Sequence, residues 1–171
     1  MPLRDAERDL LEAGARDAAE AILRLAQRES ARILSVDVEP LSALVARLAP
    51  RAVVVGFVVS GGVQGRFALV LTEPAARVIA QAMVGGRHTQ VPSEKLGKRL
   101  TGALTELGNI AASAFMNGVA ELVHQSCVPS VPAFGHGDAA EVLPAALGDA
   151  LEVQVARLII GEVEVELAFA R

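Results

Sequence analysis

Two polar side chains, Glu106 and Asn109, stand three residues apart within residues 99–123, a stretch whose apolar spacing predicts a long helix. Residues three and four apart lie on the same side of a helix, so the two side chains project from neighbouring turns. They offer hydrogen bonding and charge pairing from one carboxylate and one neutral carboxamide. Composition alone favours a plainer interpretation, a solvated helix face.

The rest of this helix predicts a groove on one side and a core contact on the other. The polar side continues at steps of three and four through Arg99, Gly102, Ser113 and Asn117. The predicted core stripe is apolar or small: Leu100, Leu104, Leu107, Ala111, Phe115, Gly118 and Leu122. Small residues lie beside the polar ones and predict a shallow, accessible groove: Gly102, Gly108, Ala112 and Ser113.

The residues Glu106-Leu107-Gly108-Asn109-Ile110, followed twenty-two positions on by Pro132, resemble the motif of the CheC/CheX/FliY family of response-regulator phosphatases. Residues 53–86 also resemble the middle segment of CheX and CheC. That segment includes Val-Ser-Gly-Gly-Val-Gln-Gly at residues 59–65 and Ala-Met-Val-Gly-Gly at residues 82–86. The resemblance extends over nearly the whole chain.

The resemblance implies a hydrolase that removes phosphate from the aspartyl phosphate of a CheY-like response regulator, in chemotaxis or two-component signalling. Asn109 is then expected to orient the attacking water and Glu106 to pair with the regulator's lysine. Phosphoryl transfer depends on positioning and electrostatics more than on a strong base, which suits these two groups. The chain is expected to bind no cofactor or metal of its own, because the regulator brings a divalent metal such as Mg.

Two other functions stay open at this point. A non-catalytic adaptor of the same fold would bind a response regulator or CheD through this surface, and it would not need the Asn109 carboxamide. A purely structural duplicated domain would bury Glu106 and Asn109 or pack over them. The resemblance to CheX favours a homodimer, and a CheC-like layout is also compatible with a monomer.

The chain departs from the family pattern in two places. Gly102 stands four residues before the glutamate, where the family often has Ser or Asp, with Thr101 and Thr105 beside it. The first helix has Glu12-Ala13-Gly14-Ala15, with alanine in the asparagine position, and the register of Asp9 and Glu12 puts a carboxylate there instead. We therefore expect one active site, as in CheX.

Other constellations predict no site. His124, Cys127 and His136 do not have zinc-ligand spacing, and we expect surface histidines and a buried thiol. The glycines at 61, 62 and 65 lack the Gly-Lys-Ser/Thr of a phosphate loop, so they predict a hairpin turn. Glu162, Glu164 and Glu166 alternate with apolar residues, which predicts the solvated face of a strand rather than a cation site. Pro132 is expected to end a loop where the chain enters a strand.

The order of predicted elements repeats, which indicates an α+β fold made of two pseudo-symmetric helix-strand-helix-hairpin halves. Long helices are expected to pack on a mostly antiparallel, CheC-like sheet, in one domain of residues 1–171 with repeats at about 3–86 and 93–171. The predicted helices are 3–29, 41–48, 72–86, 93–125 and 138–147, with a boundary at 87–92. Thr72 is the predicted N-cap of the third helix, which places Glu73 in its first turn. The predicted strands are 31–38, 52–59, 66–71, 151–158 and 162–169, and an extended piece holds Pro129 and Pro132. The strand of 52–59 is apolar on both faces, so we expect the hairpin that it forms with 66–71 to be central or part of an interface.

Composition sets the remaining bounds. In 171 residues, 52% are hydrophobic, which allows a sizeable core. The net charge of -4 and the absence of Trp and Tyr argue against nucleic-acid binding. A single cysteine predicts a reducing compartment, and no apolar run approaches the roughly 18 residues of a membrane span. We expect a soluble, cytoplasmic protein with no membrane partner.

Overall fold

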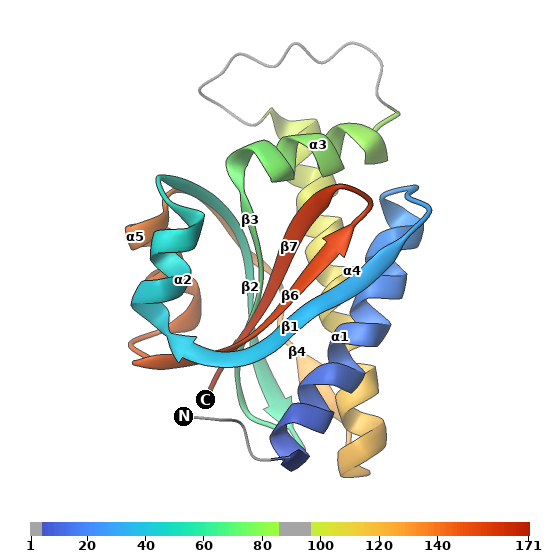
Figure 1. The fold of residues 1–171 in the computed structure, drawn as a ribbon, viewed down its shortest axis with the longest axis vertical. Coiled ribbons are helices and arrows are strands. Elements are labelled where there is room, and N and C mark those ends of the chain that lie inside the picture. Colours follow the sequence, from blue (N-terminus) through green and yellow to red (C-terminus); the bar gives the residue numbers. More distant parts are fainter. Residues whose placement is uncertain (1–4, 86–96) are drawn as a thin grey trace.

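A computed structural model describes residues 5–85 and 97–171, and it is an antiparallel sheet with helices on both faces (Figure 1). The strand order is β1-β6-β7-β3-β2-β4, and β5 also pairs with β2. The helices are α1 (Asp5–Leu25), α2 (Leu41–Leu48), α3 (Glu73–Met83), α4 (Lys98–Val123) and α5 (Ala139–Leu147). The strands are β1 (Ala31–Pro40), β2 (Arg51–Gly61), β3 (Gly65–Thr72), β4 (Cys127–Pro129), β5 (Ala133–Asp138), β6 (Glu152–Ile160) and β7 (Val163–Ala170). The predicted α+β class and antiparallel sheet are confirmed.

The hairpin of β2 and β3 is central, as its apolar sequence predicts. On one face Val53, Val55 and Phe57 join the core formed with α1, α3 and α4. On the other face Ala52 and Val54 join a second core, formed with α2 and α5. In Figure 1, α1 and α4 therefore lie on the opposite side of the sheet from α2 and α5. A strand with a core on each face reads as a continuous apolar run.

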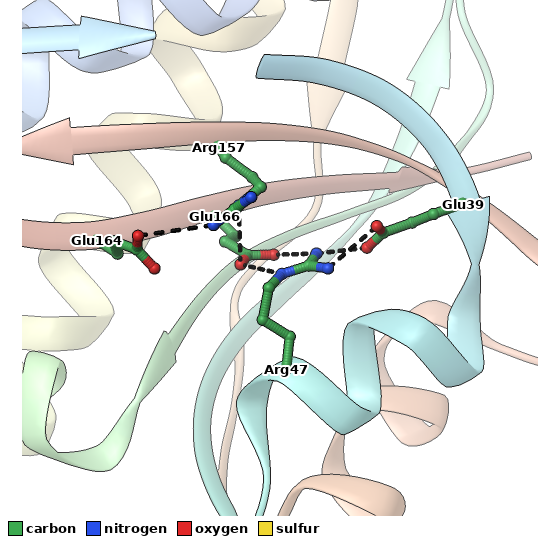
Figure 2. A network of polar contacts seen from close by, with 5 residues as sticks. All are labelled: Glu39, Arg47, Arg157, Glu164 and Glu166. Carbon is green, nitrogen blue, oxygen red and sulfur yellow. Dashed lines mark hydrogen bonds and ion pairs between the residues drawn. The ribbon is translucent and has the colours of Figure 1, made fainter. Parts of the chain in front are cut away.

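The predicted solvated face of the last strand is wrong at Glu166. Glu162 and Glu164 are exposed, but Glu166 is only 4% exposed, because α2 covers that part of the sheet. Arg47 of α2 donates to both Glu166 oxygens, at 2.7 and 2.8 Å. The same guanidinium pairs with Glu39, as Figure 2 shows. These hydrogen bonds, first those that Arg47 donates to Glu166 and then those to Glu39, raise the pKa of Arg47 above its usual value.

Element ends differ from prediction by a few residues, for local reasons. The first helix ends at Leu25 rather than residue 29, and Gln27 then has a φ of 53°. The long helix ends at Val123, followed by His124 in the left-handed conformation. Thr72 caps α3 as predicted, accepting a hydrogen bond from the Ala75 amide. The predicted boundary at 87–92 lies outside the described residues.

Candidate functional site on helix α4

Small residues fix the depth at which α4 lies. A Cβ at Gly108 would come within 2.4 Å of Val55 in β2, and one at Gly118 within 2.8 Å of the Ala13 carbonyl in α1. Gly108 and Ala112 therefore lie in the core, and the prediction that they line a groove beside the polar residues is wrong. They are small because a helix must approach the sheet closely there. Helix α4 is therefore packed closely against both the sheet and the neighbouring α1.

The face of α4 opposite this contact is open. Glu106 and Asn109 are exposed, together with the other predicted polar positions: Arg99, Gly102, Ser113 and Asn117. Neither Glu106 nor Asn109 makes a side-chain hydrogen bond or ion pair with any residue that the structure describes. The two side chains thus have their polar atoms available to a partner, and nothing in the described chain packs over them.

The core stripe is confirmed except at its end. Leu100, Leu104 and Phe115 are buried, but Leu122 is 49% exposed. In the last two turns the buried side of α4 passes through Met116 and Val119 instead, because this helix must contact both α1 and the sheet. Leu122 then falls beside the buried stripe rather than on it.

A hollow lies next to Glu106, where the end of α1, the end of α3 and the start of α4 meet. A Cβ at Gly102 would meet nothing within 4 Å, so this position has room for a larger residue. Thr105 donates its hydroxyl to the Thr101 carbonyl at 2.8 Å, which leaves it committed to the backbone. The hollow is lined by Arg24, Leu25, Gln27, Met83, Val84, Lys98, Arg99, Gly102, Ala103 and Glu106.

The first helix presents a different surface. Ala15, which occupies the asparagine position of the Glu12 register, is fully buried. A side chain there points into the core, so this register cannot offer a second pair of exposed groups. In the alternative register, Asp9 is exposed and Glu12 is half-buried, with Arg8 at 4.0 Å from the Glu12 carboxylate.

The two histidines and the cysteine that were considered as metal ligands differ in burial. His124 is exposed and Cys127 is buried, both as predicted. His136 is not a surface histidine, because its side chain is only 13% exposed and its Nε2 lies 2.8 Å from Glu73. Among the described residues, no group of three His, Cys, Asp or Glu side chains could hold a metal ion.

Sequence reasoning missed the cluster around Glu73. Its carboxylate receives Arg51 at 2.8 Å and Arg77 at 2.9 Å, besides His136. The hydrogen bond with His136 first, then those from the two arginines, lowers the pKa of Glu73 to about 2. The cluster joins α3 to β2 and β5 near the start of β2. The predicted cap at Thr72 placed Glu73 in a first turn, but the partner in β5 carried no local signal.

Pro132 lies half-buried directly before β5, which begins at Ala133. The prediction that Pro132 ends a loop where the chain enters a strand is confirmed, but this loop joins β4 to β5, because β4 lies between it and the long helix. No helix in the described parts of the chain is long and apolar enough to cross a membrane.

The arrangement of sheet and helices matches solved structures over nearly the whole chain, although no family model and no curated protein matches the sequence. FliY from Thermotoga maritima is 22% identical, with a TM-score of 0.76 over 99% of this chain and 92% of that one. A structure of the CheX-CheY-BeF3-Mg complex from Borrelia burgdorferi is 19% identical, with a TM-score of 0.67 over 95% and 97% of the two chains.

The same fold also occurs in FliM. The FliM middle domain from Vibrio alginolyticus is 9% identical, with a TM-score of 0.64 over 96% of this chain and 91% of that one. The chain therefore has the CheC-like fold shared by CheX, FliY and FliM. Likeness at these identities defines the fold, and function depends on the residues of the site.

Proposed function

We propose that this chain is a phosphatase that hydrolyses the aspartyl phosphate of a CheY-like response regulator. The observation that carries the proposal is the pair of Glu106 and Asn109 on adjacent turns of α4, exposed and unpaired within the described residues. The pair matches the family motif, on a fold that CheX uses in its complex with CheY.

The chemistry needs little from the phosphatase beyond positioning. The Asn109 carboxamide orients the attacking water in line with the phosphorus, and as a neutral group it does not repel the phosphoryl oxygens. Glu106, one turn away, pairs with the regulator's lysine and fixes the register of the two proteins. The regulator supplies the divalent metal. Helix α4 holds both groups rigidly, because it is packed against both the sheet and α1.

The site on this chain works with two groups rather than three. Gly102 offers no side chain at the position where the family often has Ser or Asp, and Thr105 is bonded to its own backbone. Because Ala15 is buried in the corresponding register of α1, we propose one active site per chain.

A non-catalytic adaptor is the second candidate function, and the likeness to the FliM middle domain favours it. An adaptor would bind a response regulator or CheD through the same face of α4. It would use Glu106 for binding and, because it catalyses no reaction, it would not need the Asn109 carboxamide. The two functions therefore differ in what happens when the carboxamide is removed.

The deciding experiment measures phosphate release from a receiver domain charged with acetyl phosphate. The receiver is one encoded beside this chain's gene, and wild type is compared with Asn109→Ala and Asn117→Ala. Asn117 is a matched control, since it is an exposed asparagine on the same face two turns further along α4. We expect wild type and Asn117→Ala to accelerate release and Asn109→Ala not to. Binding of the receiver without acceleration by any of the three proteins would establish the adaptor instead.

A further inference from the structure

Three basic side chains gather around the hollow beside Glu106. Lys98 and Arg99 come from the first turn of α4, and Arg24 comes from the last turn of α1. All three are exposed. The hollow is lined by residues from the end of α1, the end of α3 and the start of α4, and Glu106 is among them.

The two cations of α4 stand where a helix does not favour them. The N-terminus of a helix carries a partial positive charge, so acidic residues stabilise the first turn and basic residues do not. Helix α4 has no acidic residue in its first turn, and its N-cap, Gly97, provides no side-chain hydrogen bond. Within the described residues, neither Lys98 nor Arg99 has an ion-pair partner. Basic residues that disfavour the first turn, with no compensating contact among the described residues, point to a function at these two positions.

The charges of this chain and of a phosphorylated receiver give a reason for basic residues at the start of α4. The chain has a net charge of -4, and a phosphorylated receiver presents an anionic face made of the phosphoryl group and metal-binding carboxylates. Two anionic surfaces repel unless a local patch of opposite sign guides their encounter. The hollow is such a patch: Lys98 and Arg99 have no ion-pair partner within the described residues, and Arg24 pairs with Glu20 at 3.7 Å. Glu106, the carboxylate that would fix the register of the complex, is among its lining residues.

We propose that Arg24, Lys98 and Arg99 form a docking subsite for an acidic segment of the phosphorylated receiver. This inference rests on the proposed function, and it assigns these cations to encounter and affinity rather than to bond breaking. Gly102 leaves the floor of the hollow open, since a Cβ there would touch nothing within 4 Å. The acidic segment would enter over Gly102 and leave Glu106 and Asn109 to the phosphorylated aspartate.

The test compares Arg99→Glu with Arg66→Glu. Both substitutions change the net charge equally, but Arg66 is an exposed residue of β3 beside Gly148, away from the hollow. We expect kcat/KM to fall about tenfold in Arg99→Glu, through KM, and to stay unchanged in Arg66→Glu. The loss should shrink at roughly 0.5 M salt, where the screening length falls to a few ångströms. Equal kcat/KM in the two variants, or a loss in kcat with KM unchanged, would overturn the docking subsite.

We expect Arg99→Glu to leave the protein folded, because an acidic residue in the first turn of α4 interacts favourably with the helix dipole. A binding assay separates the two proposals. It uses the same receiver carrying beryllium fluoride, a mimic of the phosphoryl group, and needs no turnover. If binding depends on Arg99 and no protein accelerates release, docking stands and the phosphatase proposal fails. If Asn109 is required for release and neither KM nor binding responds to Arg99, the phosphatase stands and docking fails.

Discussion

Glu106 and Glu166 are both glutamates on long regular elements, and they occupy opposite environments. Glu106 lies on α4, exposed, with no partner in the described chain. Glu166 lies on β7, 4% exposed, with both oxygens bonded to Arg47 and Arg157 3.8 Å away. The buried carboxylate ties α2 to the sheet (Figure 2), and the exposed one is free to bind another molecule. This difference predicts that stability and activity depend on separate residues.

The largest expected effect is on stability. Replacing Arg47 with Met leaves Glu166 buried beside Arg157 only, and breaking a buried pair by removing one partner costs about 3–5 kcal/mol. Chemical denaturation measures this loss, with Arg8→Met as the control, because the side chains of the Arg8–Glu12 pair are 46% and 40% exposed and lie 4.0 Å apart. The double variant Arg47→Met/Glu166→Leu should recover most of the loss. A failure to recover would show that Arg47 acts through packing rather than through charge.

The second effect is on activity and leaves stability unchanged. We expect Asn109→Ala to lower kcat by about 100-fold or more, since misplacing a positioned reactant costs that much. Its free energy of unfolding should stay within about 0.5 kcal/mol of wild type, because Asn109 is exposed and unbonded in the described chain. Unfolding of this variant would contradict the contrast between the two glutamates, since it would make Asn109 a structural residue.

Much of this contrast could be predicted from the sequence, and the wrong prediction of a solvated Glu166 has a physical cause. The exposed face of α4 follows from helical spacing alone, and the central hairpin follows from an apolar run on both faces. The burial of Glu166 could not be predicted in this way, because its partner Arg47 is 119 positions away in the chain. His136 and Glu73 are 63 positions apart, and they meet only when β5 pairs with β2. Local pattern identifies which face is apolar, but only tertiary packing decides which polar residues are covered.

The third expected effect is a dependence of the free energy of unfolding on acidic pH, through Glu73. The pKa of Glu73 is about 2 in the folded chain against 4.5 for an ordinary glutamate, so its ionised form stabilises the fold. That contribution is complete above about pH 4.5 and is lost as the pH falls from there to about 2. We expect Glu73→Gln to lower the free energy of unfolding at pH 7 by on the order of 2 kcal/mol. Denaturation of both proteins at several pH values should show the difference vanish near pH 2, and a constant difference would rule out titration as its cause.

The smallest expected effect concerns Gly102, on the exposed face of α4 that carries Glu106 and Asn109. Gly102→Ser adds a side chain where a Cβ meets nothing within 4 Å, and serine is a better helix residue than glycine by about 0.5 kcal/mol. We therefore expect a slightly higher free energy of unfolding. We also expect a change in kcat of less than about threefold, because in the proposed mechanism the pair of Glu106 and Asn109 performs the positioning. A rise in kcat of tenfold or more, with KM unchanged, would show that the missing hydroxyl limits the proposed reaction and that three polar groups, not two, make the complete site.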